Sequence, residues 1–250
     1  MAMQPRALWM LARPMVALLV FLLAGPAQTA AGDWYPLDPG DAWEYIDGYG
    51  THHFEIINGT RQLLGRTVTV RSYIGGIDDS LENYWLTGGD GTILLGGFNN
   101  RQVSLALAYD PPVAMLVPPP TLGQTWSTHT VAYNLADMSV YNEFDYPLSV
   151  DEEVDLTLPA GTYHAFGIGA PPPAAGRAAT VVLPSGHRLS LDGRSALAAP
   201  GAGSTNATDW YAQGVGDVQY LAYSLNQLVN FSIPTPIAVA SWGKLKRLYR

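Results

Sequence analysis

Residues 83–95 have the sequence NYWLTGGDGTILL, which holds a clear hairpin signal. Aromatic and aliphatic residues stand on both sides of the glycine-rich stretch 88–91. Such residues favour strands, and glycine supplies the positive φ angles of tight turns. The stretch therefore predicts two antiparallel strands joined by a short turn.

Outward from this hairpin, apolar and polar residues alternate with a period of two, which is typical of strands. The alternating segments are 43–49, 54–57, 67–72, 105–109, 131–135, 154–158, 163–168 and 218–233. Asn58-Gly59 predicts a hairpin turn, Pro111-Pro112 are expected to stop a strand, and 181–189 predict a further hairpin. The 26 glycines and 19 prolines fit many turns and little helix. We expect roughly ten strands or more.

The composition excludes several classes of protein. Hydrophobic residues make up 48% of the chain, and 14 Tyr, 7 Trp and 6 Phe argue against a disordered chain. Cysteine is absent, which excludes disulfides, thiolate metal ligands and cysteine nucleophiles. The formal net charge of −8 makes binding to nucleic acid or to anionic lipid surfaces unfavourable.

The N-terminus has the features of a secretory signal peptide. Arg6 and Arg13 precede or flank an apolar run of 10 residues, 15–24, and small residues at 29–31 follow Gly25-Pro26. The run is too short to span a bilayer, which takes about 20 residues, but it suits a cleaved signal. We expect residues 1–31 to be removed near Ala31 and the remainder to be secreted, either to the periplasm or to the extracellular space or cell surface. No later segment is long enough to span a membrane as a helix.

The remaining chain is interpreted as two related β halves, 32–117 and 118–233, followed by a basic tail, 234–250. Both halves share the order Gly-x-x-Trp, strand, glycine turn, strand, Trp-containing strand and glycine turn, with Trp43, Trp85, Trp126 and Trp210 as markers. Chance similarity between two β-rich halves is the competing interpretation. The Pro-led tail is interpreted as a docked helix, a disordered tail, or a sorting or attachment signal.

Three stretches resemble motifs of a protein family: 34–45 (WYPLDPGDAWEY), 158–163 (LPAGTY) and 210–218 (WYAQGVGDV). They are similar to the YYPL-x-x-G-x-x-W-x-Y opening, the VPAGTF turn and the W-x-A-x-GVG-x-V motif of secreted, largely uncharacterised bacterial envelope proteins. The resemblance implies a curved antiparallel sheet related to lipoprotein-carrier half-barrels. It implies no activity, so it assigns no catalytic residue. The lipobox cysteine of many such proteins is missing here, so a lipid anchor is not expected.

Residues with catalytic or metal-binding chemistry are scattered. His52 and His53 are adjacent, so on a strand they point to opposite faces, and His129, His164 and His187 lie on separate strands or turns; all five are expected at the surface or half-buried. Two acidic clusters, 78–82 and 151–155, are expected in solvated loops rather than in calcium sites. No Gly-x-Ser-x-Gly elbow is present. We therefore assign no catalytic, metal or cofactor site, and the sequence leaves the ligand-binding residues unknown.

The sequence thus predicts an all-β antiparallel protein, a curved sheet, half-barrel or sandwich with little helix beyond the signal peptide. Its expected function is non-enzymatic binding of an apolar or lipid-like molecule, or of another envelope component. A cell-surface structural or interaction protein, attached through its tail, is the alternative. A hydrolase is a weaker one, which would require histidine and acidic side chains to converge in one cleft.

Overall fold

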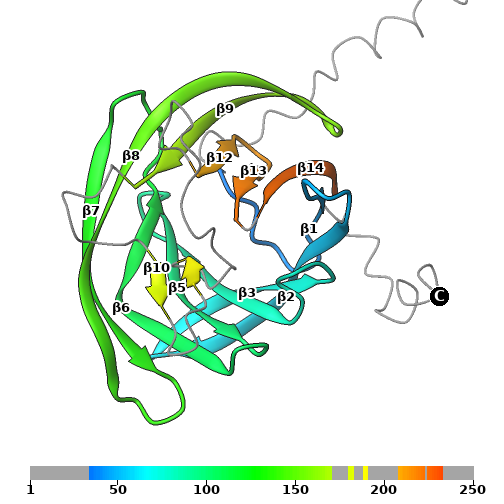
Figure 1. The fold of residues 1–250 in the computed structure, drawn as a ribbon. Coiled ribbons are helices and arrows are strands. Elements are labelled where there is room, and N and C mark those ends of the chain that lie inside the picture. Colours follow the sequence, from blue (N-terminus) through cyan, green and yellow to red (C-terminus); the bar gives the residue numbers. More distant parts are fainter. Residues whose placement is uncertain (1–33, 171–179, 183–187, 191–207, 223, 233–250) are drawn as a thin grey trace, which may run out of the picture. The chain divides into compact units, whose positions relative to one another are not determined.

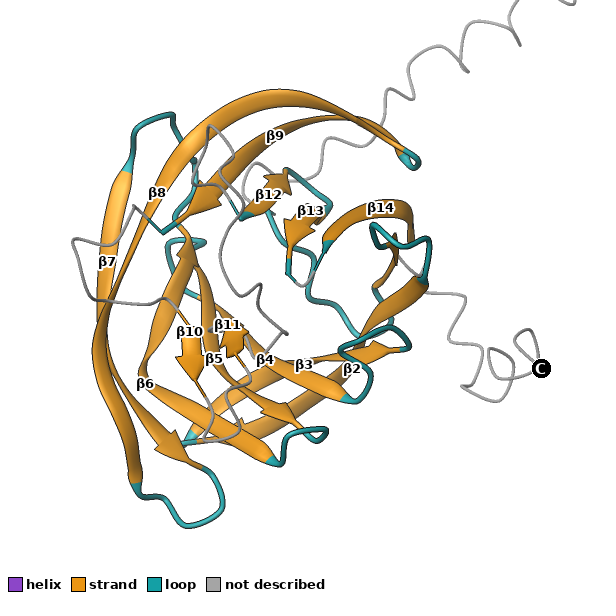
Figure 2. Cartoon of the chain, in the orientation of Figure 1, coloured by secondary structure: helices purple, strands orange, loops and turns teal. Residues whose placement is uncertain are grey.

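A computed structural model describes residues 34–170, 180–182, 188–190, 208–222 and 224–232. These residues form fourteen strands and no helix (Figures 1 and 2). The strands are β1 (Ala42–Ile46), β2 (His52–Leu63), β3 (Arg66–Ile74), β4 (Leu81–Thr87), β5 (Ile93–Asn100), β6 (Leu105–Leu116), β7 (Thr125–Asn134), β8 (Val140–Leu158), β9 (Gly161–Gly169), β10 (Thr180–Val182), β11 (Arg188–Ser190), β12 (Asp209–Ala212), β13 (Gly216–Leu221) and β14 (Leu225–Ser232). Within the described residues, no helix is long and apolar enough to cross a membrane.

Twelve strands close into one antiparallel barrel (Figure 1). They follow chain order from β2 to β9, then β12, β13, β14 and back to β1, while β10 and β11 form a separate two-stranded sheet. At the seam, β1 pairs with β14 and Trp43 lies opposite Phe231. Every barrel strand has two neighbours, so no backbone edge is left open. The predicted all-β antiparallel fold is confirmed, and its curvature runs to full closure.

Two predicted hairpins are confirmed. In the turn between β4 and β5, the Gly88 amide donates to the Thr92 carbonyl at 2.7 Å and the Gly91 amide donates to the Gly88 carbonyl at 3.0 Å. Gly91 has a φ of 86°, which is strained for residues with a side chain. The strands of the second hairpin, β10 and β11, pair with Val181 opposite Leu189.

The turn predicted at Asn58-Gly59 is wrong. Both residues lie inside β2, where a bulge shifts the register between Ile57 and Gly59 and Gly59 has a φ of 126°. The chain turns instead at Leu64-Gly65, both with positive φ. A bulge uses the same positive φ as a tight turn, so the Asn-Gly pair fits either one.

The prolines 111–112 do not end a strand as expected, because β6 continues through them to Leu116. The register with β5 passes from Ala108 opposite Gly97 directly to Val113 opposite Leu95. The prolines thus occupy positions that need no amide donor toward β5. The run 218–233 is also divided, into β13 and β14.

The barrel interior is packed with aromatic side chains, two of which come from the segment before β1. Trp34 packs edge-on against Phe166, with 5.7 Å between ring centroids. Tyr35 lies between Trp43 and Trp85, at centroid distances of 6.0 and 5.0 Å. The chain therefore enters the barrel before it forms the first strand, and its aromatic rings fill space that the strands alone would leave open.

The expected boundary between halves, 117/118, falls between β6 and β7, and both strands belong to the same barrel. The duplication stays a prediction. The signal peptide, the tail 234–250 and His187 lie outside the described residues.

Candidate functional site

A pocket of about 310 Å³ opens where three connections meet at one end of the barrel. The β1–β2 turn contributes Asp47, Tyr49 and Thr51, and β2 itself contributes His53. The β3–β4 connection contributes Gly76, Ile77 and Asp78. Ser224 and Asn226 lie in or beside the β13–β14 turn and complete the described lining. The volume lies at the lower end of the usual range for ligand pockets, about 300–1,000 Å³. A small molecule is the size of ligand that fits.

Asp47 is held rigidly at the rim of this pocket. Its Oδ1 accepts the backbone amides of Tyr49 at 2.9 Å and Thr51 at 2.7 Å. Its own amide donates to the Thr51 carbonyl at 3.0 Å. This is an aspartate-stabilised turn, and it places the carboxylate before any ligand arrives.

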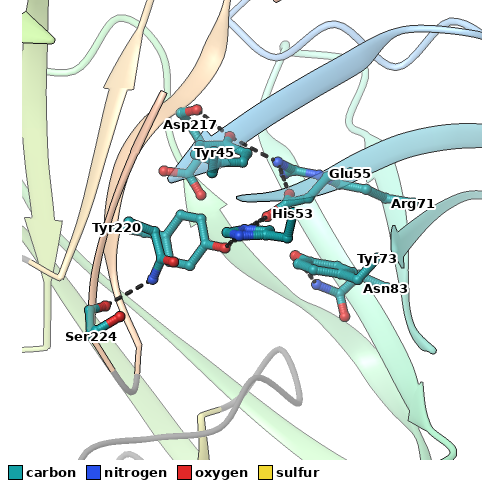
Figure 3. Close-up of polar contacts among 10 residues, drawn as sticks. Tyr45, His53, Glu55, Arg71, Tyr73, Asn83, Asp217, Tyr220 and Ser224 are labelled. Atoms are coloured by element: carbon teal, nitrogen blue, oxygen red, sulfur yellow. Dashed lines mark hydrogen bonds and ion pairs between the residues drawn. The ribbon is translucent and has the colours of Figure 1, made fainter. Parts of the chain in front are cut away.

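His53 connects the pocket to the barrel interior (Figure 3). Its Nε2 lies 2.6 Å from the Tyr220 hydroxyl, and that hydroxyl donates to Glu55 Oε1 at 2.9 Å. A tyrosine hydroxyl has one proton, which here goes to the buried carboxylate, so the hydroxyl oxygen accepts from His53. Nε2 therefore carries a proton.

Behind His53 lies a buried ion pair. Arg71 and Glu55 both have fully buried side chains, and Arg71 Nη2 contacts Glu55 Oε2. The guanidinium carbon lies 4.6 Å from the Trp43 ring centroid and 5.2 Å from that of Tyr35, so aromatic faces replace part of its hydration. Removing two charges from water is costly unless they are paired in this way.

Further hydrogen bonds extend this polar core. Arg71 donates to the Tyr45 hydroxyl at 3.2 Å, and that hydroxyl donates to the Asp217 carbonyl oxygen at 2.5 Å. On the other side, Asn83 Nδ2 donates to the Tyr73 hydroxyl at 2.9 Å (Figure 3). Residues from β1, β2, β3 and β13 are thus joined in one network that fixes the position of His53, and the Asn83–Tyr73 pair lies beside it with the Tyr73 ring centroid 5.9 Å from the Arg71 guanidinium carbon.

The two adjacent histidines face opposite sides of β2, as their spacing predicts. His52 is exposed and contacts Glu44 at 2.9 Å, whereas His53 is only 6% exposed. The expectation of a surface or half-buried side chain is therefore wrong for His53. Its burial is explained by its contacts with Tyr220, which is far away in sequence, and with Glu55, which lies on the same face of β2.

His129 and His164 lie exposed on β7 and β9, and each has a carboxylate beside both ring nitrogens. His129 contacts Asp145 at 3.0 Å and Glu143 at 3.1 Å, both on β8. The hydrogen bond with Asp145 is the main cause that raises the pKa of His129. His164 repeats the arrangement with Asp155 and Glu153, and its hydrogen bond with Asp155 raises its pKa.

The acidic stretch 151–155 is not a loop, because it lies within β8. Its side chains alternate across the strand: Asp155 contacts His164, and Glu152 accepts from Trp210 Nε1 at 2.8 Å. In the other cluster, Asp78 and Asp79 lie in the β3–β4 connection and Glu82 lies on β4. No group of three or more His, Asp or Glu side chains within the described ranges is arranged to hold a metal ion.

No protein-family model matches the chain, and no curated protein matches it. The chain is similar to a solved structure, the crystal structure of a "putative lipoprotein" from Parabacteroides distasonis. The alignment covers 81% of this chain and 99% of that chain, at 12% sequence identity and a TM-score of 0.31.

Proposed function

We propose that the chain is a secreted, non-enzymatic binding protein that holds a small molecule in the pocket at the barrel end. The observation that supports this most is the construction of the pocket. A rigid turn carries Asp47, and a buried charged network positions His53. Burying an ion pair stabilises a fold little compared with apolar packing, so its use here fits a role in positioning a binding group.

The lining favours a polar ligand over the apolar or lipid-like one expected from the composition. Among the described lining residues, the side chains that are polar or charged are Asp47, Thr51, His53, Asp78, Ser224 and Asn226, and Tyr49 adds a hydroxyl group. The large aromatic side chains Trp43, Trp85 and Tyr35 pack against one another in the barrel interior instead of lining the pocket. Aromatic packing thus explains the composition without an apolar ligand.

The hydrolase alternative required histidine and acidic groups in one cleft, and His53, Asp47 and Asp78 do line this pocket. Among the described lining residues the serine is Ser224, and His53 Nε2 contacts Tyr220 rather than this serine. A nucleophile activated by a base needs a hydrogen bond between the two. We therefore propose binding rather than hydrolysis.

The test is native mass spectrometry of residues 32–250 purified gently from a secreting host, alongside the variant Asn226→Leu. Asn226 is 6% exposed and lines the pocket, so the change replaces the amide with a branched apolar side chain of similar shape and removes its polar contacts. We expect a small mass bound to the parent chain that is lost on denaturation and absent from the variant. The polypeptide mass alone, together with no thermal stabilisation by the host's small-molecule extract, would contradict the proposal.

The alternative of surface attachment through the tail concerns residues 234–250, which lie outside the described part of the chain. Deleting them and following localisation tests it separately. Unchanged localisation would remove the attachment hypothesis.

A further inference from the structure

Two side chains of the pocket lining keep an oxygen that can accept a hydrogen bond from a ligand. Asp47 uses Oδ1 for the Tyr49 and Thr51 amides, and within the described residues Oδ2 has no donor. Asn226 donates its Nδ2 to the Ser224 carbonyl at 2.8 Å, which leaves its Oδ1 without a donor there. A carboxylate and an amide oxygen in these positions can only receive hydrogen bonds.

His53 adds a third acceptor in the neutral form of its ring. Nε2 donates its proton to Tyr220, so the lone pair of the neutral ring is on Nδ1. A Cβ placed on Gly76 would lie 3.1 Å from His53 Cβ and 3.7 Å from Nδ1. The Nδ1 edge therefore lies toward Gly76, which itself lines the pocket.

The charge of the lining has one sign. Asp47 and Asp78 contribute carboxylates, and no lysine or arginine lines the pocket among the residues that the structure describes. The cation closest behind His53, Arg71, is paired with Glu55 and lies against aromatic rings. A ligand that brings a positive charge and several N–H or O–H donors matches this lining, whereas an anion would meet two carboxylates.

Resting on the proposed function, we propose that the pocket binds a small polyhydroxylated amine of the amino-sugar class. The ammonium group pairs with the second oxygen of Asp47, and hydroxyl groups donate to His53 Nδ1 and Asn226 Oδ1.

The experiment compares glucosamine, glucose and glucuronate by isothermal titration calorimetry at pH 6.5, where the amine is protonated. The three probes share one ring and differ in charge. We expect glucosamine to bind at least roughly tenfold more tightly than glucose, because charge-assisted hydrogen bonds are about twice as strong as neutral ones. Glucuronate is expected to show no binding.

The matched variants are Asp47→Asn and Asp79→Asn. Asparagine keeps the Oδ1 that accepts the turn amides but replaces the charged Oδ2 with a donor, so glucosamine should bind Asp47→Asn no better than glucose. Asp79 accepts the Gly75 amide at 2.7 Å in the next connection but does not line the pocket. Asp79→Asn should therefore leave the preference for glucosamine unchanged.

Equal binding of glucose and glucosamine, a preference for glucuronate, or an unchanged preference in Asp47→Asn would each overturn the inference and leave the binding function standing. The same holds if none of the three sugars binds while native mass spectrometry finds another bound ligand. Absence of both sugar binding and a co-purified ligand would overturn the inference and the proposed function together. The comparison of probes on the parent chain keeps the test valid if Asp47→Asn does not fold.

Discussion

Histidines in two regions of this barrel have opposite surroundings. His53 is buried below the pocket, where its Nε2 donates to Tyr220 and its Nδ1 edge lies toward Gly76. His164, exposed on β9, has Asp155 beside one nitrogen and Glu153 beside the other. In the first arrangement the Tyr220 hydroxyl links the ring to the buried Glu55 carboxylate, because its proton goes to Glu55 and its oxygen accepts from Nε2. The second favours the protonated ring, because both nitrogens then donate to carboxylates.

The comparison shows that the loss of a charged partner affects the stability of the fold more when the pair is buried than when it is exposed. Arg71 and Glu55 form an ion pair with no exposure to solvent, whereas the His129 and His164 pairs lie in water. Water screens the exposed pairs and replaces a lost partner, but it cannot reach the buried one. The predictions below test this contrast, from the largest expected effect to the smallest.

Glu55→Gln should lower the free energy of unfolding by about 3–5 kcal/mol, because it leaves Arg71 buried without its counterion. The control is Glu153→Gln, which removes an exposed carboxylate from His164 and should cost less than about 1 kcal/mol. Urea denaturation followed by tryptophan fluorescence measures both. A similar loss of unfolding free energy in the two variants would contradict the difference between the buried and the exposed pair.

Tyr220→Phe removes the hydroxyl that joins His53 to Glu55, and it should cost about 1–3 kcal/mol because two buried polar groups lose a partner. Tyr133→Phe, on a half-buried tyrosine of β7 with no hydrogen bond to its hydroxyl among the described residues, should change the unfolding free energy by less than about 0.5 kcal/mol. The same denaturation experiment compares them. The buried network would be refuted as described if both tyrosines tolerated the change equally.

His129 and His164 should titrate above 6.5, the ordinary value, because Asp145 and Asp155 favour their protonated rings. A raised pKa in the folded state means that the stabilisation is fully present below the unfolded value and is lost as the pH rises through the folded value. Proton NMR of the histidine rings measures both midpoints. Asp145→Asn should return only His129 toward 6.5, and a shift of both midpoints would show that the pairs are not independent.

Local patterns predicted the elements of the fold but not the long-range contacts that build the site. The turn at 88–91 follows from adjacent glycines, so sequence alone located it. A turn at Asn58-Gly59 would place Glu55 opposite Gln62, whereas the bulge lets β2 run on and places Glu55 opposite Tyr73. That change of register brings Arg71 to Glu55, so an error at one turn conceals the ion pair.

His53 could not be identified for a similar reason. Its partner Tyr220 is 167 residues away and becomes a neighbour only when the barrel closes. Alternation in 54–57 also leaves open which face of β2 points inward, because Phe54 and Ile56 are as apolar as Ile57. One signal was present: Glu55 stands within an apolar run, and a carboxylate there requires a partner.

The seam between β1 and β14 also affects how the protein is made. Trp43 Nε1 donates to the Val215 carbonyl across 172 residues, so the contact forms only after nearly the whole barrel has been synthesised. Until then every nascent chain exposes two unpaired strands, to which a second chain can attach. Contacts this distant in sequence also form slowly. The yield of folded protein should therefore depend on how long the incomplete barrel is kept apart from its own copies.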